Sequence, residues 1–149
     1  MRQDYAETIA AALELYPPGL RELVADVDFL TGTDPLFAGL HDYADTDDGR
    51  SYRSTAHVAY PWHVLGPRAR RRTTVVLPTP SSLRTVVHEL GHVLDWQLAF
   101  SHAAAPVSWY AGTNRCEAMA EAVTSWLIPG YARRPDEATI ALLEDLARR

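Results

Sequence analysis

Cysteine, long apolar runs and excess positive charge are all scarce in this chain of 149 residues. The single cysteine, Cys116, excludes an internal disulfide. No apolar run reaches the roughly 20 residues of a membrane-spanning helix, and the polar residues 1–7 do not resemble a secretion signal. A net charge of −5 disfavours general binding to nucleic acid. We therefore expect a cytoplasmic protein without a nucleic-acid or membrane partner, although a dedicated export route would leave no trace here.

The length and the 47% hydrophobic content fit one globular domain, residues 1–149, with one core. What this domain does contain is an H-E-x-x-H motif, His88-Glu89-Leu90-Gly91-His92. On a helix, His88 and His92 lie one turn apart on the same face, so both imidazoles can bind one zinc ion. Glu89 lies beside them, where it can accept a proton from a zinc-bound water. The motif predicts a zinc-dependent peptidase.

The context of the motif favours a helix that is buried on one side. Residues 83–98 can form a helix that starts at Ser81 or Ser82, just after two prolines. At about 100° per residue, His88, His92 and Asp95 fall on one side of that helix. The opposite arc is apolar, with Leu83, Val86, Val87, Leu90, Val93, Leu94 and Leu98. The alternative, a surface helix with two solvated histidines, does not explain this arc.

A catalytic zinc site needs a third protein ligand. The metzincin pattern would place a histidine at position 98, where this chain has Leu98, so that layout is excluded. Downstream, Glu117 and Glu121 lie four residues apart on one helical face, with apolar residues on the opposite arc. Physical reasoning does not separate these two carboxylates well, and it leaves open that both are solvated surface groups.

Two segments together resemble a known group of enzymes. Tyr110–Glu121 reads Y-x-x-T-N-x-x-E-x-x-A-E, and residues 88–95 read H-E-L-G-H-V-L-D. Both are similar to the catalytic domain of anthrax lethal factor and its relatives, which are gluzincin metallopeptidases. The resemblance covers residues 81–127, roughly a third of the chain, and lies in spacing rather than in overall identity.

The resemblance implies a role for each matching residue. One zinc ion per chain would be bound by His88, His92 and Glu117, with Glu89 as the general base. Tyr110 would donate a hydrogen bond to the oxyanion, although a tyrosine here can also simply pack at the start of a helix. The supporting residues would be Glu121, holding a ligand histidine by its free ring nitrogen, and Asp95, lying below the site.

The chain also departs from the family. Ala118 and Met119 stand where the family often has aromatic residues, so the shape of the pocket does not follow from the resemblance. The large accessory domains of the toxin have no counterpart in these 149 residues, so the biological target does not follow either. Cys116, beside Glu117, fits a small buried thiol on the apolar arc better than a metal ligand.

The order of the predicted elements is typical of an α+β fold. A helix over residues 4–16 ends at Pro17–Gly19, or a short second turn starts there and runs to Leu23. We predict strands at 24–30, 39–44, 52–60 and 73–77, with an Asp48–Gly49 hairpin signal between the middle two, and later helices at 115–128 and 135–148. We expect a zincin-like domain in which a small mixed sheet packs on the H-E-x-x-H helix and a C-terminal helical part carries the third ligand.

Two charged clusters have a simple interpretation. Four aspartates in 42–48 lack the spacing and the closing glutamate of a calcium loop, and therefore fit a solvated hairpin. Four arginines in 68–72 fit a solvated loop, or alternatively a subsite for acidic peptide residues. The remaining histidines lack metal-ligand spacing and fit ordinary surface or edge positions: His41, His57, His63 and His102.

The predicted reaction is hydrolysis of a peptide bond in a peptide or protein substrate. Zinc would lower the pKa of its water toward 7, and Glu89 would carry the proton to the leaving amine. The substrate would add as an extended strand along a sheet edge that the sequence does not identify. Two alternatives are a catalytically silent zinc-binding regulatory domain and a helical interaction module without metal; Glu89 and Tyr110 favour the enzyme. Oligomeric state and cleavage specificity stay open.

Overall fold

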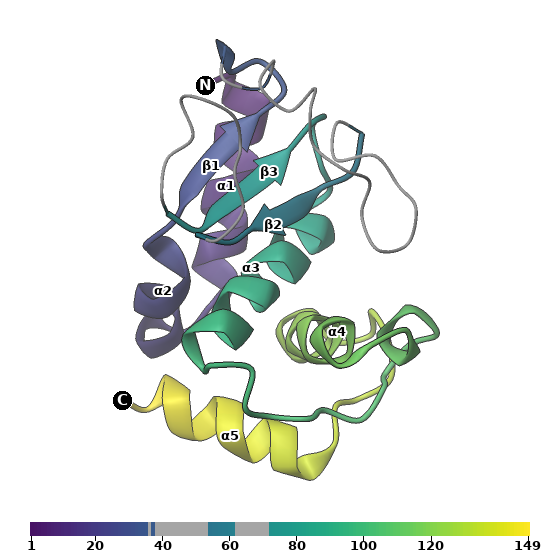
Figure 1. The fold of residues 1–149 in the computed structure, drawn as a ribbon. Coiled ribbons are helices and arrows are strands. Elements are labelled where there is room, and N and C mark those ends of the chain that lie inside the picture. The colour runs from purple at the N-terminus through teal and green to yellow at the C-terminus, as the bar shows by residue number, and fades with distance from the viewer. Residues whose placement is uncertain (36, 38–53, 62–71) are drawn as a thin grey trace.

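The computed structural model describes residues 1–35, 37, 54–61 and 72–149 of the chain (Figure 1). The described residues form five α-helices, one short 3₁₀ helix and a three-stranded sheet. In chain order these elements are α1 (Gln3–Leu15), α2 (Pro18–Ala25), β1 (Asp28–Thr31), β2 (His57–Ala59), β3 (Thr74–Leu77), α3 (Leu83–Gln97), η2 (Tyr110–Gly112), α4 (Arg115–Leu127) and α5 (Glu137–Ala147). In this part of the chain, no helix has the length and apolar character needed to cross a membrane.

The sheet is mixed, with β3 in the middle. β1 pairs with β3 in parallel, which places Leu30 opposite Val76. β2 pairs with β3 antiparallel, which places Val58 opposite Val75. Every residue of β3 is buried, as expected for a run of threonine, valine and leucine in a central strand. Because β3 leads directly toward α3, the central strand positions the start of the motif-bearing helix.

The connection from β3 to α3 is held from two sides. The hydroxyl of Tyr5 in α1 donates a hydrogen bond to the carbonyl of Pro78 at 3.3 Å. Gly32, just after β1, donates its N–H to the carbonyl of Leu77 at 3.0 Å. A Cβ at Gly32 would lie 1.9 Å from the Pro78 oxygen, so this close approach requires glycine. The N-terminal end of α3 is thereby fixed against the sheet and α1.

α3 lies at the centre of the molecule (Figure 1). It contacts α1, α2 and the sheet on one side, and α4 on the other, with η2 beside α4. α5 contacts α2 and α4. Apolar side chains of α3 are fully buried in the core that these elements share: Val86, Val87, Leu90, Val93 and Leu94. The apolar arc of α3 therefore packs into the core, as its sequence predicts.

The structure confirms the α+β class, the four longer helices to within two residues, and the strand at 73–77 to within one. Two strand predictions are partly wrong. Residues 24–30 divide between α2, which buries Leu20 and Val24 at helical spacing, and a strand that starts only at Asp28. Of the described part of the other strand, residues 54–60, only His57–Ala59 pair with β3. The predicted strand at 39–44 and the hairpin turn lie outside the described residues.

Candidate metal centre

The two histidines of the motif project from one face of α3. The helix begins after Ser82, whose hydroxyl accepts a hydrogen bond from the N–H of Thr85 at 3.3 Å and so caps the first turn. The imidazole rings of His88 and His92 meet edge to face, with their centroids 4.8 Å apart. Their side chains are only 12% and 10% exposed. Leu83, expected on the apolar arc, is 37% exposed at the first helical position.

Glu117 reaches these histidines from the first turn of α4. Asn114 caps that turn, because its Oδ1 accepts a hydrogen bond from the N–H of Glu117 at 2.8 Å. α3 and α4 approach closely at Gly91, where a Cβ would lie 3.1 Å from the Cα of Ala120 and 3.2 Å from its carbonyl oxygen. The missing side chain at Gly91 therefore lets the two helices pack closely enough for Glu117 to contact both imidazoles.

His88, His92 and Glu117 bring three potential ligand atoms together. His88 Nε2 lies 2.9 Å from Glu117 Oε2, and His92 Nε2 lies 3.1 Å from Glu117 Oε1. Ligands around a tetrahedral metal with bonds of about 2.0–2.1 Å are about 3.3 Å apart, so small movements would suffice to hold an ion. Glu117 Oε2 is buried, and no donor among the described residues is aligned to hydrogen-bond it. The three residues form a group at metal-binding distance.

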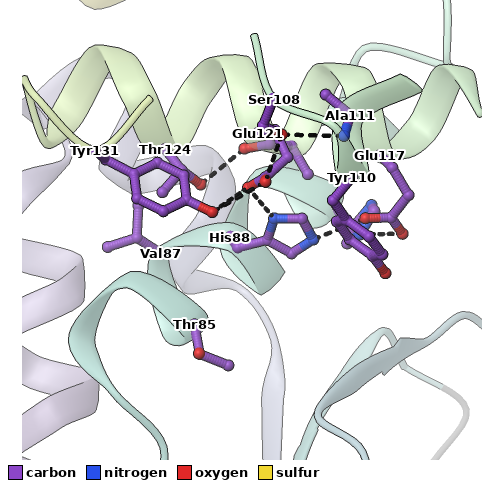
Figure 2. A network of polar contacts seen from close by, with 12 residues as sticks. Thr85, Val87, His88, Ser108, Tyr110, Ala111, Glu117, Glu121, Thr124 and Tyr131 are labelled. Carbon is purple, nitrogen blue, oxygen red and sulfur yellow. Dashed lines mark hydrogen bonds and ion pairs between the residues drawn. The ribbon is translucent and has the colours of Figure 1, made fainter. Parts of the chain in front are cut away.

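Glu121 contacts the same cluster on the Nδ1 side of His88 (Figure 2). Its Oε2 lies 3.0 Å from His88 Nδ1, the nitrogen that does not point toward Glu117. Its carboxylate also accepts hydrogen bonds from the hydroxyl of Ser108 at 2.9 Å, and from that of Tyr131 at 2.9 and 3.0 Å. Oε2 of Glu121 therefore holds the His88 ring while Ser108 and Tyr131 hold the carboxylate in place. Glu117, by contrast, meets the Nε2 atoms of both histidines.

The pKa values of the cluster are shifted toward its charged forms. Burial alone would lower the pKa of His88, but close contacts with the carboxylates of Glu117 and Glu121 outweigh it and raise the pKa to about 10. Burial alone would raise the pKa of Glu117, but its contacts with His88 and His92 lower that pKa far below its usual range. The pKa of Glu121 is lowered in the same way. The carboxylates of Glu117 and Glu121 thus favour either protons on the imidazoles or a bound metal ion.

A cleft of about 740 Å³ opens beside the cluster. His88, Glu89, Tyr110 and Glu121 all line it. Glu89 is buried, with 6% of its surface exposed. The ring of Tyr110, at the start of η2, lies 5.9 Å from the His88 ring between centroids, and Figure 2 shows it beside Glu117. The structure therefore places the two residues expected to act on a substrate at the wall of one cavity.

Asp95 lies one turn beyond His92 and is fully buried. Arg115, the first residue of α4, pairs with its carboxylate and donates a second hydrogen bond to the carbonyl of His102. Burial raises the pKa of Asp95 even though Arg115 opposes that shift. The ion pair links the end of α3 to the start of α4. From this position Asp95 can support the two helices that carry His92 and Glu117.

Among the other histidines, His57 and His102 lie outside the cluster. His57 Nδ1 lies 2.8 Å from the carbonyl of Thr55 on the edge of the sheet, and His102 Nε2 lies 2.8 Å from the hydroxyl of Thr139. His41 and His63 are outside the described residues. Of the four arginines in 68–72, only Arg72 is described, and it pairs with Asp26.

Two residues that hold Glu121, namely Ser108 and Tyr131, were not predicted from the sequence. Ser108 carries no pattern that would mark it. Tyr131 follows Pro129 and Gly130, and Gly130 has a φ of 90°, a value that favours glycine and turns the chain after α4. A proline–glycine break followed by an aromatic residue is only a weak signal for such a contact.

A scan against protein-family models, a search of curated proteins and a search of solved structures each found no match to this chain. The assignment of a function therefore rests on the residues and their geometry.

Proposed function

We propose that this protein is a zinc-dependent metallopeptidase with a gluzincin ligand set, related in its site to the catalytic domain of anthrax lethal factor. One observation carries the proposal. The Nε2 atoms of His88 and His92 converge on Glu117, while Glu89 of the same helix lines the adjoining cleft. Two imidazole nitrogens and one carboxylate are the ligands that zinc takes in catalytic sites with an open fourth position.

Each nearby residue has a chemical task under this proposal. Zinc would supply an activated water and a Lewis acid for the peptide carbonyl. Glu89 accepts the proton of the attacking water and delivers it to the leaving amine, as a general base and then a general acid. Tyr110, beside His88 at the cleft wall, donates its hydroxyl proton in a hydrogen bond to the oxyanion.

Glu121 and Asp95 act through other residues. Glu121 holds the Nδ1 side of His88, so that Nε2 stays directed toward Glu117. Asp95 pairs with Arg115, two positions before Glu117, and so sets how α4 starts relative to α3. Under this proposal both residues position ligands, and neither touches the substrate.

The sheet supports a zincin-like arrangement with β2 as the substrate-binding strand. β2 is antiparallel to β3 and has β3 as its partner in the described sheet order. Ser54, Thr55 and Ala56, which lead into β2, line the cleft together with His88 and Glu89. An extended peptide that pairs along β2 would therefore run past the proposed metal.

The test combines metal analysis with peptide digestion. Wild-type protein, Glu89→Gln and Glu144→Gln are purified, their zinc content at neutral pH is measured, and each is incubated with a peptide library. Glu144 lies exposed on α5, so its variant controls for the loss of one carboxylate. We expect all three proteins to carry about one zinc, and only Glu89→Gln to lose cleavage, by roughly 10²–10⁴-fold.

Two other outcomes separate the alternatives. A wild-type protein without zinc at neutral pH would overturn the proposal. A zinc-bound protein whose wild type and Glu89→Gln forms are equally inert on every peptide would instead indicate a silent binding or regulatory domain.

A further inference from the structure

Arg84 places a positive charge at one end of the cleft. It lies in the first turn of α3, four residues before His88, and lines the same cavity as His88 and Glu89. Residues four apart share a helix face, so Arg84 belongs to the side of α3 that carries the two histidines. The H-E-x-x-H helix thus presents a guanidinium next to the proposed metal site.

The guanidinium of Arg84 has no carboxylate partner among the described residues. Its central carbon lies 5.5 Å from the centre of the Tyr131 ring, a cation–π contact that uses no N–H donor. By contrast, Arg72 and Arg115 pair with Asp26 and Asp95. Arg84 is therefore supported by an aromatic face while its hydrogen-bonding capacity remains directed to a ligand or to solvent.

Tyr131 also shows where the guanidinium of Arg84 lies in the site. Its hydroxyl is bound to Glu121, so its ring lies on the Glu121 side of His88, and Figure 2 shows Tyr110 on the other side. Arg84 packs over the Tyr131 ring and therefore belongs to the Tyr131 end of the site. The cleft has the oxyanion donor toward one end and a cation toward the other.

We propose that Arg84 binds a carboxylate of the substrate and thereby makes the cleft selective for peptides with an acidic group near the cleaved bond. This inference rests on the proposed peptidase function. An arginine binds a carboxylate through paired N–H donors, which provides both affinity and orientation. The carboxylate has two possible sources, an aspartate or glutamate side chain, or the C-terminal carboxylate of the peptide.

The geometry limits how far the carboxylate lies from the reacting carbonyl. Four helical residues span about 6 Å along α3. An extended peptide rises about 3.3 Å per residue and directs alternate side chains to the same face. A carboxylate bound by Arg84 therefore belongs to a residue about two positions from the cleaved bond.

The experiment uses matched peptides that are acetylated and amidated at their ends. In each pair a single position carries Glu or Gln, and the position is moved along a fixed sequence. We expect wild-type protein to cleave one Glu peptide about 10- to 100-fold better in kcat/KM than its Gln partner, the range a charge-assisted hydrogen bond supplies. Arg84→Gln should bring this ratio near one, and Arg84→Lys should keep part of it. Arg134→Gln is the control, since Arg134 is exposed and lies outside the cleft lining.

A binding measurement separates this inference from the peptidase proposal. The same peptides are titrated into Glu89→Gln and into the Glu89→Gln/Arg84→Gln double variant, and dissociation constants are compared by calorimetry. Glu-selective binding that disappears with Arg84 supports the inference even if no peptide is cleaved. Cleavage or binding that distinguishes neither Glu from Gln in any pair nor a free C-terminus from an amidated one overturns it, whatever the peptidase result. A third peptide set with a free C-terminus and no acidic side chain identifies which carboxylate is bound.

Discussion

The two sides of α3 differ in what they bury. Toward α1, the core cluster is apolar, and a neutral buried hydrogen bond reaches α3 from the hydroxyl of Tyr16 to the carbonyl of Val87 at 2.8 Å. Toward α4, the same helix buries imidazoles against two carboxylates, Glu117 and Glu121. α3 therefore packs toward α1 through apolar side chains and, on its α4 side, also brings ionisable groups together.

This difference suggests that the α1 side of α3 contributes mainly to folding stability and the α4 side mainly to metal binding. Apolar burial stabilises at about 25 cal/mol per Å² of surface removed from water, and it needs no ligand. Buried charges cost free energy unless a partner compensates them, so the α3–α4 side gains most when a cation is present. Substitutions on the α4 side should consequently change metal binding, whereas substitutions on the α1 side should change folding.

The largest expected effect is on the α4 side, where the two glutamates should not be equivalent. Glu117→Ala removes the carboxylate that meets both Nε2 atoms, so we expect zinc affinity to fall on the order of a thousandfold or more. Glu121→Ala removes only the contact with His88 Nδ1, and outer partners of this kind contribute about 10–100-fold. Competition with a fluorescent chelator measures both, and the reverse order would overturn the ligand assignment.

The next effect belongs to the α1 side. Leu94 is fully buried in the core cluster, so Leu94→Ala should lower the free energy of unfolding of the metal-free protein by about 3 kcal/mol. Urea denaturation followed by circular dichroism measures the loss. Zinc affinity of the folded variant should stay within about threefold of wild type, since the change touches no ligand and distant sites act nearly independently. A thousandfold loss of zinc affinity here would show that the two sides are not separable.

The same contrast explains what the sequence could predict. The 3.6-residue periodicity of α3 and α4 is a local property, so the bounds of both helices and the apolar arc with Leu90 and Leu94 followed from it. The pairing of His88 and His92 on one face also followed from their spacing alone. Arg84, four residues before His88, carried the same signal, and its place in the cleft could have been predicted.

Contacts between distant segments could not be predicted in this way. Glu117 and Glu121 share a face of α4, and only the packing of α4 on α3 at Gly91 decides which carboxylate meets the Nε2 atoms. Tyr131 reaches Glu121 after a turn whose direction depends on Gly130. The predictions of β1 and β2 were partly wrong for a related reason, since β1 is defined by pairing with β3 more than by its own pattern.

A smaller effect should appear in pH dependence. The folded-state pKa of His88 is about 10, above the ordinary value of about 6.5. In the metal-free protein this pairing stabilises the fold fully below pH 6.5 and is lost as the pH rises through 10. Zinc needs a neutral imidazole, so its affinity should rise about tenfold per pH unit between pH 7 and 9, with release of a proton. Calorimetry in buffers of different ionisation enthalpy measures that proton, and a pH-independent affinity would contradict the expectation.

The α1 side should not contribute to this pH response. Tyr16 is its buried ionisable contact to α3, and burial raises the pKa of that phenol well above its ordinary value. Tyr16 therefore stays neutral throughout the range in which His88 titrates. Tyr16→Phe should leave the slope of zinc affinity against pH unchanged, which makes it the control for the measurement.

The smallest expected effect concerns Gly91, where α3 and α4 pack closely against each other. Gly91→Ala replaces a glycine by a better helix former, which favours the fold by up to about 1 kcal/mol. The new Cβ would lie 3.1–3.2 Å from backbone atoms of Ala120, so α4 must shift by a few tenths of an ångström. We expect these effects nearly to cancel in the free energy of unfolding, while zinc affinity falls by about threefold to tenfold, because ligation depends on geometry more steeply than packing does. Urea denaturation and chelator competition on the same preparation measure the two quantities. Equal losses in both would indicate that close packing at Gly91 serves the core, and that Glu117 would reach the histidines without it.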